Sequence, residues 1–171
     1  MSCDISLGRL EGCKDQIGGL SAVYFVNFGD AAGWTSTDEE ITAITATTPN
    51  AYKYDLRGGS TFEQNLTSSR ENGTTFSEQT LTISLKKQDA ATNKEVKLLA
   101  YGRPHILIED NNGNIFVMGE DYGSEMTATT STGAAMGDKS GYELSFSASE
   151  KGLAKLYTGV LDTDFNVTIG S

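Results

Sequence analysis

Residues 60–87, STFEQNLTSSRENGTTFSEQTLTISLKK, decide the fold class of this 171-residue chain. Asn72-Gly73 lies near their centre, and Asn-Gly between strand-like segments is the strongest short signal for a β-hairpin. The signal is strong because both central residues of a type I′ turn need positive φ. After the turn, apolar residues at 81, 83 and 85 alternate with Thr or Ser at 80, 82 and 84. Since successive side chains of a strand point to opposite faces, this alternation predicts a strand with one buried face.

Further strands are predicted on both sides of this hairpin. Leu20 to Phe28 contains a continuous apolar run, which is typical of a strand covered on both faces. Tyr122 to Thr132 is polar and Thr-rich, and therefore suits a sheet edge or a projecting arm. The remaining predicted strands are Thr37 to Thr48, Ala51 to Arg57, His105 to Asp110, Asn114 to Met118, Gly141 to Ser149 and Phe165 to Ile169.

One helix is predicted among these strands. Thr92 to Glu95 fits a capping box, in which the Thr hydroxyl and the Glu carboxylate each accept a backbone N–H. An earlier start capped by Asp89 fits equally well, and Gly102 and Pro104 end the helix. Strands before and after a single helix predict a mainly β fold, an antiparallel β-sandwich or barrel with one flanking α-helix.

The length of the chain predicts a single domain over residues 1–171, with a flexible N-terminal segment 1–18 and a C-terminal tail 153–171. The first 20 residues carry five charged side chains, and no long apolar run follows, so neither a secretory signal nor a membrane-spanning segment is predicted. Cys3 and Cys13 are therefore expected to be reduced thiols, as in cytoplasmic proteins, rather than a disulfide bridge.

The residues capable of metal or nucleophile chemistry form no catalytic pattern. His105 is the only histidine, and it forms no close-spaced ligand set with Cys3 or Cys13. We interpret it as a hydrogen-bonded or half-exposed strand residue. A carboxylate pair for glycoside hydrolysis has no signature along a sequence, and Trp34 is the only tryptophan for a sugar platform. We therefore predict a protein that is not an enzyme and has no cofactor.

Two acidic stretches invite comparison with calcium sites. Asp110 to Asn114 resembles the start of an EF-hand loop, but Ile115 stands where that loop needs glycine, and a hairpin turn explains the same residues. Charged turns in strand proteins are usually only solvated. A weaker site remains open as an alternative, and its ligands would come from Glu109, Asp110, Glu120 and Asp121.

The two signs of charge occupy different parts of the chain. The formal net charge is −10, which argues against nonspecific capture of bare nucleic acid, because phosphate binding needs a clustered basic surface. Pro104 through Asp138 contain six acidic residues and no Lys or Arg, whereas five basic residues lie between Lys86 and Arg103. The simplest interpretation is two solvated faces. The functional interpretation is a head-to-tail contact, in which the basic surface of one subunit meets the acidic surface of the next.

Two segments of the chain resemble small virion proteins of tailed bacteriophages, particularly crAss-like phages. They are Gly137-Asp138-Lys139-Ser140-Gly141-Tyr142-Glu143-Leu144-Ser145-Phe146 and the preceding Ile108-Glu109-Asp110-Asn111-Asn112-Gly113-Asn114. The early Gly18-Gly19-Leu20 and Val23-Tyr24-Phe25 are similar to the opening strand of the same group. The resemblance implies a tail-tube type of fold, in which copies form a ring around a channel in the virion tail after assembly in the host cytoplasm.

The resemblance and the charge pattern together imply the partners and the contact residues. We expect self-association and contacts with neighbouring tail or connector proteins, with DNA only as cargo that does not stick to the channel, and no membrane partner. One side of the subunit contact is assigned to Lys94, Lys97, Arg103 and the Asn72-Gly73 hairpin. The other side, or the channel wall, is assigned to Glu109, Asp110, Glu120 and Asp121. A head–tail connector or completion protein and a monomeric carbohydrate-binding β-sandwich module are the alternative functions.

Overall fold

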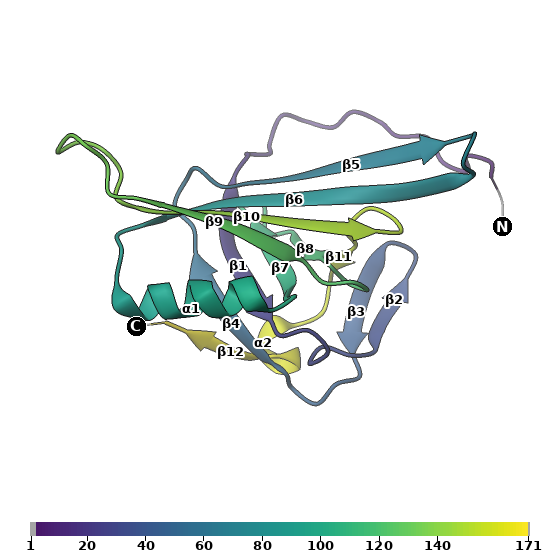
Figure 1. Ribbon diagram of the computed structural model, residues 1–171. Coiled ribbons are helices and arrows are strands. Elements are labelled where there is room, and N and C mark those ends of the chain that lie inside the picture. The colour runs from purple at the N-terminus through teal and green to yellow at the C-terminus, as the bar shows by residue number, and fades with distance from the viewer. Residues whose placement is uncertain (1–2, 171) are drawn as a thin grey trace.

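The computed structural model describes residues 3–170, which form twelve strands and two helices (Figure 1). The elements are β1 (Leu20–Val26), β2 (Trp34–Thr37), β3 (Glu40–Ile44), β4 (Asn50–Asp55), β5 (Thr61–Ser69), β6 (Thr74–Lys86), α1 (Ala90–Tyr101), β7 (His105–Asp110), β8 (Ile115–Met118), β9 (Glu125–Ser131), β10 (Gly141–Glu150), β11 (Leu156–Tyr157), α2 (Leu161–Asp164) and β12 (Asn166–Ile169). Strands hold 46% of the residues and helices 10%, which confirms the predicted mainly β fold with a flanking helix.

The strands form two sheets. The larger sheet has eight strands in the order β12-β4-β1-β7-β8-β11-β3-β2, and the smaller has four in the order β5-β6-β10-β9. Neighbouring strands run antiparallel, as predicted, except that β11 runs parallel to β3 and β12 runs parallel to β4. The predicted polar edge strand is confirmed, because β9 lies at one edge of the smaller sheet.

The β5–β6 hairpin is confirmed, but its turn differs from the predicted one. Ser69 pairs with Thr74, so residues 70–73 form a longer loop in place of a two-residue type I′ turn. Within this loop only Gly73 has positive φ, at 62°. The observed register places Phe62 opposite Leu81 and aligns two glutamines at the next inward-facing pair. A two-residue turn would slide these partners apart, so side-chain matching along the strands outweighs the Asn-Gly turn preference.

The main core lies between the two sheets. The inward side chains of β6 and β10 alternate with outward ones, and they pack against β1, β7 and β8 of the larger sheet. The fully buried members include Leu81, Ile83, Leu144 and Phe146, and the Phe146 ring lies 5.2 Å from that of Phe25. The sequence pattern therefore identified the buried face of both strands correctly.

A second core lies on the other face of the larger sheet, which curls so that its outer strands approach one another. Ile41 of β3, Leu107 of β7 and Tyr157 of β11 meet there with Phe165, which follows α2 and is 1% exposed. Within the predicted C-terminal tail, residues 156–169 thus contribute strands and core to the sheet, and the predicted late strand is confirmed as β12. Residues 1, 2 and 171 lie outside the described residues.

The strand predicted over Thr37 to Thr48 is confirmed as the shorter β3, whereas β2, which precedes it, was not predicted. The two strands run antiparallel on either side of a tight reversal at Asp38, whose φ is 54°. The uniform Thr-rich composition hides the reversal, because aspartate tolerates the left-handed conformation without the glycine that marks most such turns.

Helix α1 begins at the earlier of the two predicted positions. Asp89 is the N-cap, and its carboxylate accepts the backbone N–H of Thr92 at 2.6 Å. That hydrogen bond lowers the pKa of Asp89 below its ordinary value. The capping box at Thr92 is therefore wrong, whereas the predicted end at Gly102 is confirmed. Val96 is the buried residue of the helix, which packs beside β9 (Figure 1).

Candidate functional site

The predicted basic contact residues lie on and just after helix α1. Lys94 and Lys97 are exposed, and the Lys97 ammonium lies 5.9 Å from the centre of the Tyr101 ring. Arg103 stacks over the Phe28 ring at 4.0 Å. Leu98 and Tyr101 are also exposed on this helix, so the charged residues stand beside apolar ones. The helix thus exposes basic and apolar side chains together.

The four predicted acidic residues do not form one cluster. The Glu109 carboxylate accepts the Tyr24 hydroxyl at 3.0 Å, and Asp110 accepts two backbone N–H groups of its own turn. Both lie near the β7–β8 turn. Glu120 and Asp121 follow the other end of β8, where Glu120 forms an ion pair with Lys155 at 3.1 Å. In residues 3–170, no three His, Cys, Asp or Glu side chains are arranged to hold a metal ion.

The loop after β8 is held by buried polar side chains. His105 is 3% exposed; its Nδ1 lies 2.5 Å from the Gly119 carbonyl oxygen, and its Nε2 accepts the Gly29 N–H. Burial lowers the pKa of His105, so the neutral ring donates through Nδ1. The Gly119 N–H in turn donates to Gln79. His105 is therefore a satisfied strand histidine with a structural role, and Cys3 and Cys13 are exposed free thiols of the N-terminal segment.

Glu150, at the end of β10, anchors the same loop. Its carboxylate accepts the backbone N–H of Tyr122 at 3.1 Å and that of Asp121 at 3.4 Å. Burial raises the pKa of Glu150, opposed by these two hydrogen bonds. Gln79 and Glu150 were not predicted, although the sequence contains a signal for them. Both occupy positions in the inward-facing register of a strand, where a polar residue needs a buried partner.

The outward face of the smaller sheet is covered by short polar side chains and carboxylates. Cross-strand pairing brings them into rows, such as Thr61–Thr82–Ser145–Thr127 and Glu63–Thr80–Ser147–Glu125. We call this surface the outer polar face, and it comprises Thr61, Glu63, Asn65, Thr67, Glu78, Thr80, Thr82, Ser84, Glu125, Thr127, Thr129, Glu143, Ser145, Ser147 and Ser149. Its signal in the sequence was that most outward positions of these strands are Ser, Thr, Asn or Glu. Phe76 and Lys86 share the same register toward the two ends of β6.

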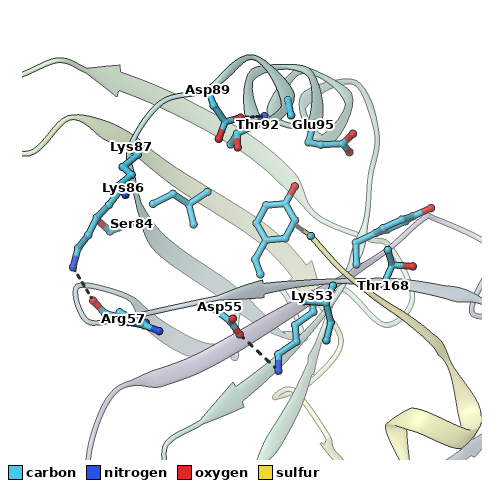
Figure 2. Close-up of a pocket in the computed structure, with 16 residues that line it drawn as sticks. Lys53, Asp55, Arg57, Ser84, Lys86, Lys87, Asp89, Thr92, Glu95 and Thr168 are labelled. Carbon is cyan, nitrogen blue, oxygen red and sulfur yellow. Dashed lines mark hydrogen bonds and ion pairs between the residues drawn. The ribbon is translucent and has the colours of Figure 1, made fainter.

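A cleft with a volume of about 650 Å³ lies between α1, β4, β12 and the end of β6. Figure 2 shows Arg57, Lys86 and Lys87 along one side of this cleft, and the N-cap Asp89 and Glu95 of α1 along another. Its apolar lining includes Tyr54, whose ring meets that of Phe25 edge-on at 4.9 Å. Burial raises the pKa of Tyr54 to about 12. We call this the helix cleft, and it was not predicted because its lining comes from distant parts of the chain.

None of the helices in the described part of the chain has the length and apolar character needed to cross a membrane. No protein-family model, curated protein or solved structure matches this chain.

Proposed function

We propose that this chain is a structural subunit of a bacteriophage tail, and that its copies form a ring around a channel for DNA or ejected proteins. The observation that carries the proposal is the outer polar face. It presents four carboxylates, from Glu63, Glu78, Glu125 and Glu143, on a background of Ser, Thr and Asn.

Such a surface has the chemistry of a channel wall for DNA. Carboxylates repel the phosphate backbone, and short hydroxyl side chains keep a water layer without offering a strong attachment point. The lysine nearest to these carboxylates, Lys139, is paired with Glu143. Lys86 stands at one end of the face, where it donates to the Arg57 carbonyl. The face therefore resists phosphate binding over most of its area.

The two ends of the smaller sheet support a head-to-tail arrangement. The β5–β6 hairpin extends beyond the body at one end, while the β9–β10 loop projects at the other (Figure 1). Leu66 and Phe76 are exposed on the hairpin, which leaves apolar surface for a neighbouring subunit. Contacts between unlike surfaces of identical subunits generate closed rings or open helical assemblies.

The basic surface of α1 is assigned to the subunit contact. We expect Lys94→Glu with Lys97→Glu to reduce assembly, because both side chains are exposed and their reversal repels an acidic neighbour. Light scattering after size exclusion measures the mass, and the wild-type assembly should weaken as salt screens the contact. Lys151→Glu reverses the charge of another exposed lysine, and it is the control for the single variants Lys94→Glu and Lys97→Glu. Unchanged assembly in the double variant would contradict the assignment of this contact.

The same measurement separates the alternatives. A purified chain that stays monomeric at all concentrations would contradict the ring and favour the carbohydrate-binding module, which a glycan array would then test. A head–tail connector would also form a ring, so labelling of intact particles with an antibody against the chain distinguishes it by position.

A further inference from the structure

The N-terminal segment carries apolar side chains that the body does not cover. Ile5, Leu7 and Leu10 are 96%, 86% and 94% exposed, and residues 3–18 form neither helix nor strand. We call residues 3–18 the N-terminal arm. Isolated exposed aliphatic residues are ordinary, but three within six positions of one extended segment indicate a contact site.

The root of the arm is held firmly by the β7–β8 turn. Asn112 accepts the backbone N–H of Ile17 at 3.1 Å and donates to the Ile17 carbonyl at 2.8 Å. Asn111 donates to the Gly18 carbonyl at 2.8 Å. These bonds fix the direction in which the arm leaves the body, while the aliphatic residues beyond the root remain in solvent.

The helix cleft presents the complementary surface. Its lining combines Tyr54 with two exposed apolar side chains, Tyr52 and Ile169, the latter 67% exposed. Charges of both signs stand around it: Arg57, Lys86 and Lys87 on one side and Asp89 and Glu95 on the helix (Figure 2). The arm likewise carries both signs beside its aliphatic residues, at Arg9 and Glu11, which are both exposed. The arm and the cleft thus have the same character, apolar residues flanked by charges of both signs.

The arm and the cleft lie at opposite ends of the molecule. In Figure 1 the arm runs along the β5–β6 hairpin toward the N-terminus at one side, while α1 and β12 lie at the other side. The arm of one chain thus extends away from its own cleft. We infer that the N-terminal arm of one copy binds in the helix cleft of the next, with Ile5 and Leu7 against its tyrosines. This inference rests on the proposed ring, and it adds a second contact between subunits to the one assigned to the basic surface of α1.

The two cysteines allow a test on the unaltered chain. Cys3 and Cys13 are its only cysteines, and both are exposed on the arm. Chains labelled at both cysteines with a thiol-reactive benzophenone are mixed with ¹⁵N-labelled chains and irradiated. The cross-linked products are then mapped by mass spectrometry. We expect cross-links between light and heavy chains at residues 52–57, 84–95 or 168–170. Cross-links between chains that lie only outside these ranges, or cross-links confined to one chain, would overturn the inference.

Variants separate the arm from the rest of the fold. Ile5→Ser, Leu7→Ser and Leu10→Ser together should abolish the cleft cross-links, with apparent affinity falling about tenfold for each aliphatic side chain removed. Ile169→Glu should have the same effect from the cleft side. Val160→Ser is the control, because Val160 is similarly exposed outside both surfaces. All variants change exposed residues, so their thermal unfolding should match that of the wild type.

Light scattering on the same samples distinguishes the inference from the proposed function. A ring whose arm does not label the cleft would overturn the inference and leave the ring standing. Cleft cross-links in an open chain of subunits would support the inference and contradict the ring. A monomer without cross-links would contradict both.

Discussion

The two faces of the smaller sheet share the same strands but have opposite chemistry. Along β10, Leu144 and Phe146 point inward and are fully buried, whereas the adjoining Ser145 and Ser147 point outward and are exposed. The inward face determines how the two sheets pack. The outward face adds little to packing, and under the proposed function its Ser, Thr and Glu residues would line the channel.

Truncation on the inward face has the largest expected effect. Phe146→Ala removes a fully buried ring that packs against Phe25, and should lower the free energy of unfolding by about 3–5 kcal/mol. The adjacent Ser145→Ala should change it by less than about 0.5 kcal/mol. Urea denaturation measures both variants. Similar losses for the two would contradict the division between the faces.

A polar residue of the inward face should have an intermediate effect. Glu150→Ala leaves two backbone N–H groups without their acceptor and should cost about 2 kcal/mol in unfolding free energy at neutral pH.

The pH dependence of stability tests the same residue. Burial raises the pKa of Glu150 above the 4.5 of the unfolded chain, so the folded state binds the proton more tightly. The contribution of Glu150 is therefore full below that value and declines as the pH rises through the folded-state pKa. Glu150→Gln should remove this decline, whereas an identical pH profile in both proteins would show that Glu150 does not titrate as described.

Ser77 should show a small effect of opposite sign. Its side chain lies in the inward register of β6, fully buried, and its Oγ has no hydrogen-bond partner among residues 3–170. Ser77→Ala removes that unsatisfied hydroxyl and should raise the unfolding free energy by up to about 1 kcal/mol. Gln79, the next inward residue, has a partner in Gly119, so Gln79→Ala should be destabilising. Destabilisation by Ser77→Ala would contradict the prediction that this hydroxyl is unsatisfied in the folded chain.

The outward face should affect DNA contact far more than stability. Glu63→Lys, Glu78→Lys and Glu125→Lys together change the net charge from −10 to −10 + 6 = −4. Each change should alter the unfolding free energy by less than about 0.5 kcal/mol, while the assembled protein should gain affinity for duplex DNA. Glu39→Lys, Glu40→Lys and Asp162→Lys give the same net charge away from this face. Equal DNA binding by the two triple variants, measured by fluorescence anisotropy, would contradict the channel wall.

Local patterns predicted most of the strands, and distant pairings account for what was missed. The alternation in β6 and β10 identified their buried faces, because it depends only on neighbouring residues. The parallel pairings of β11 and β12 join segments more than a hundred residues apart, so no local pattern could indicate them. The helix cleft was missed for the same reason. The acidic residues after Pro104 are neighbours in sequence, yet the β7–β8 hairpin separates them into two pairs.

The orientation of the smaller sheet in the assembly tests the central claim most directly. Electron cryo-microscopy of the assembled protein would show which surface faces the axis. The outer polar face is expected to line the central channel, with Glu63, Glu78 and Glu125 toward the lumen. A ring in which this face points outward or is buried between subunits, or a particle without a channel, would contradict it.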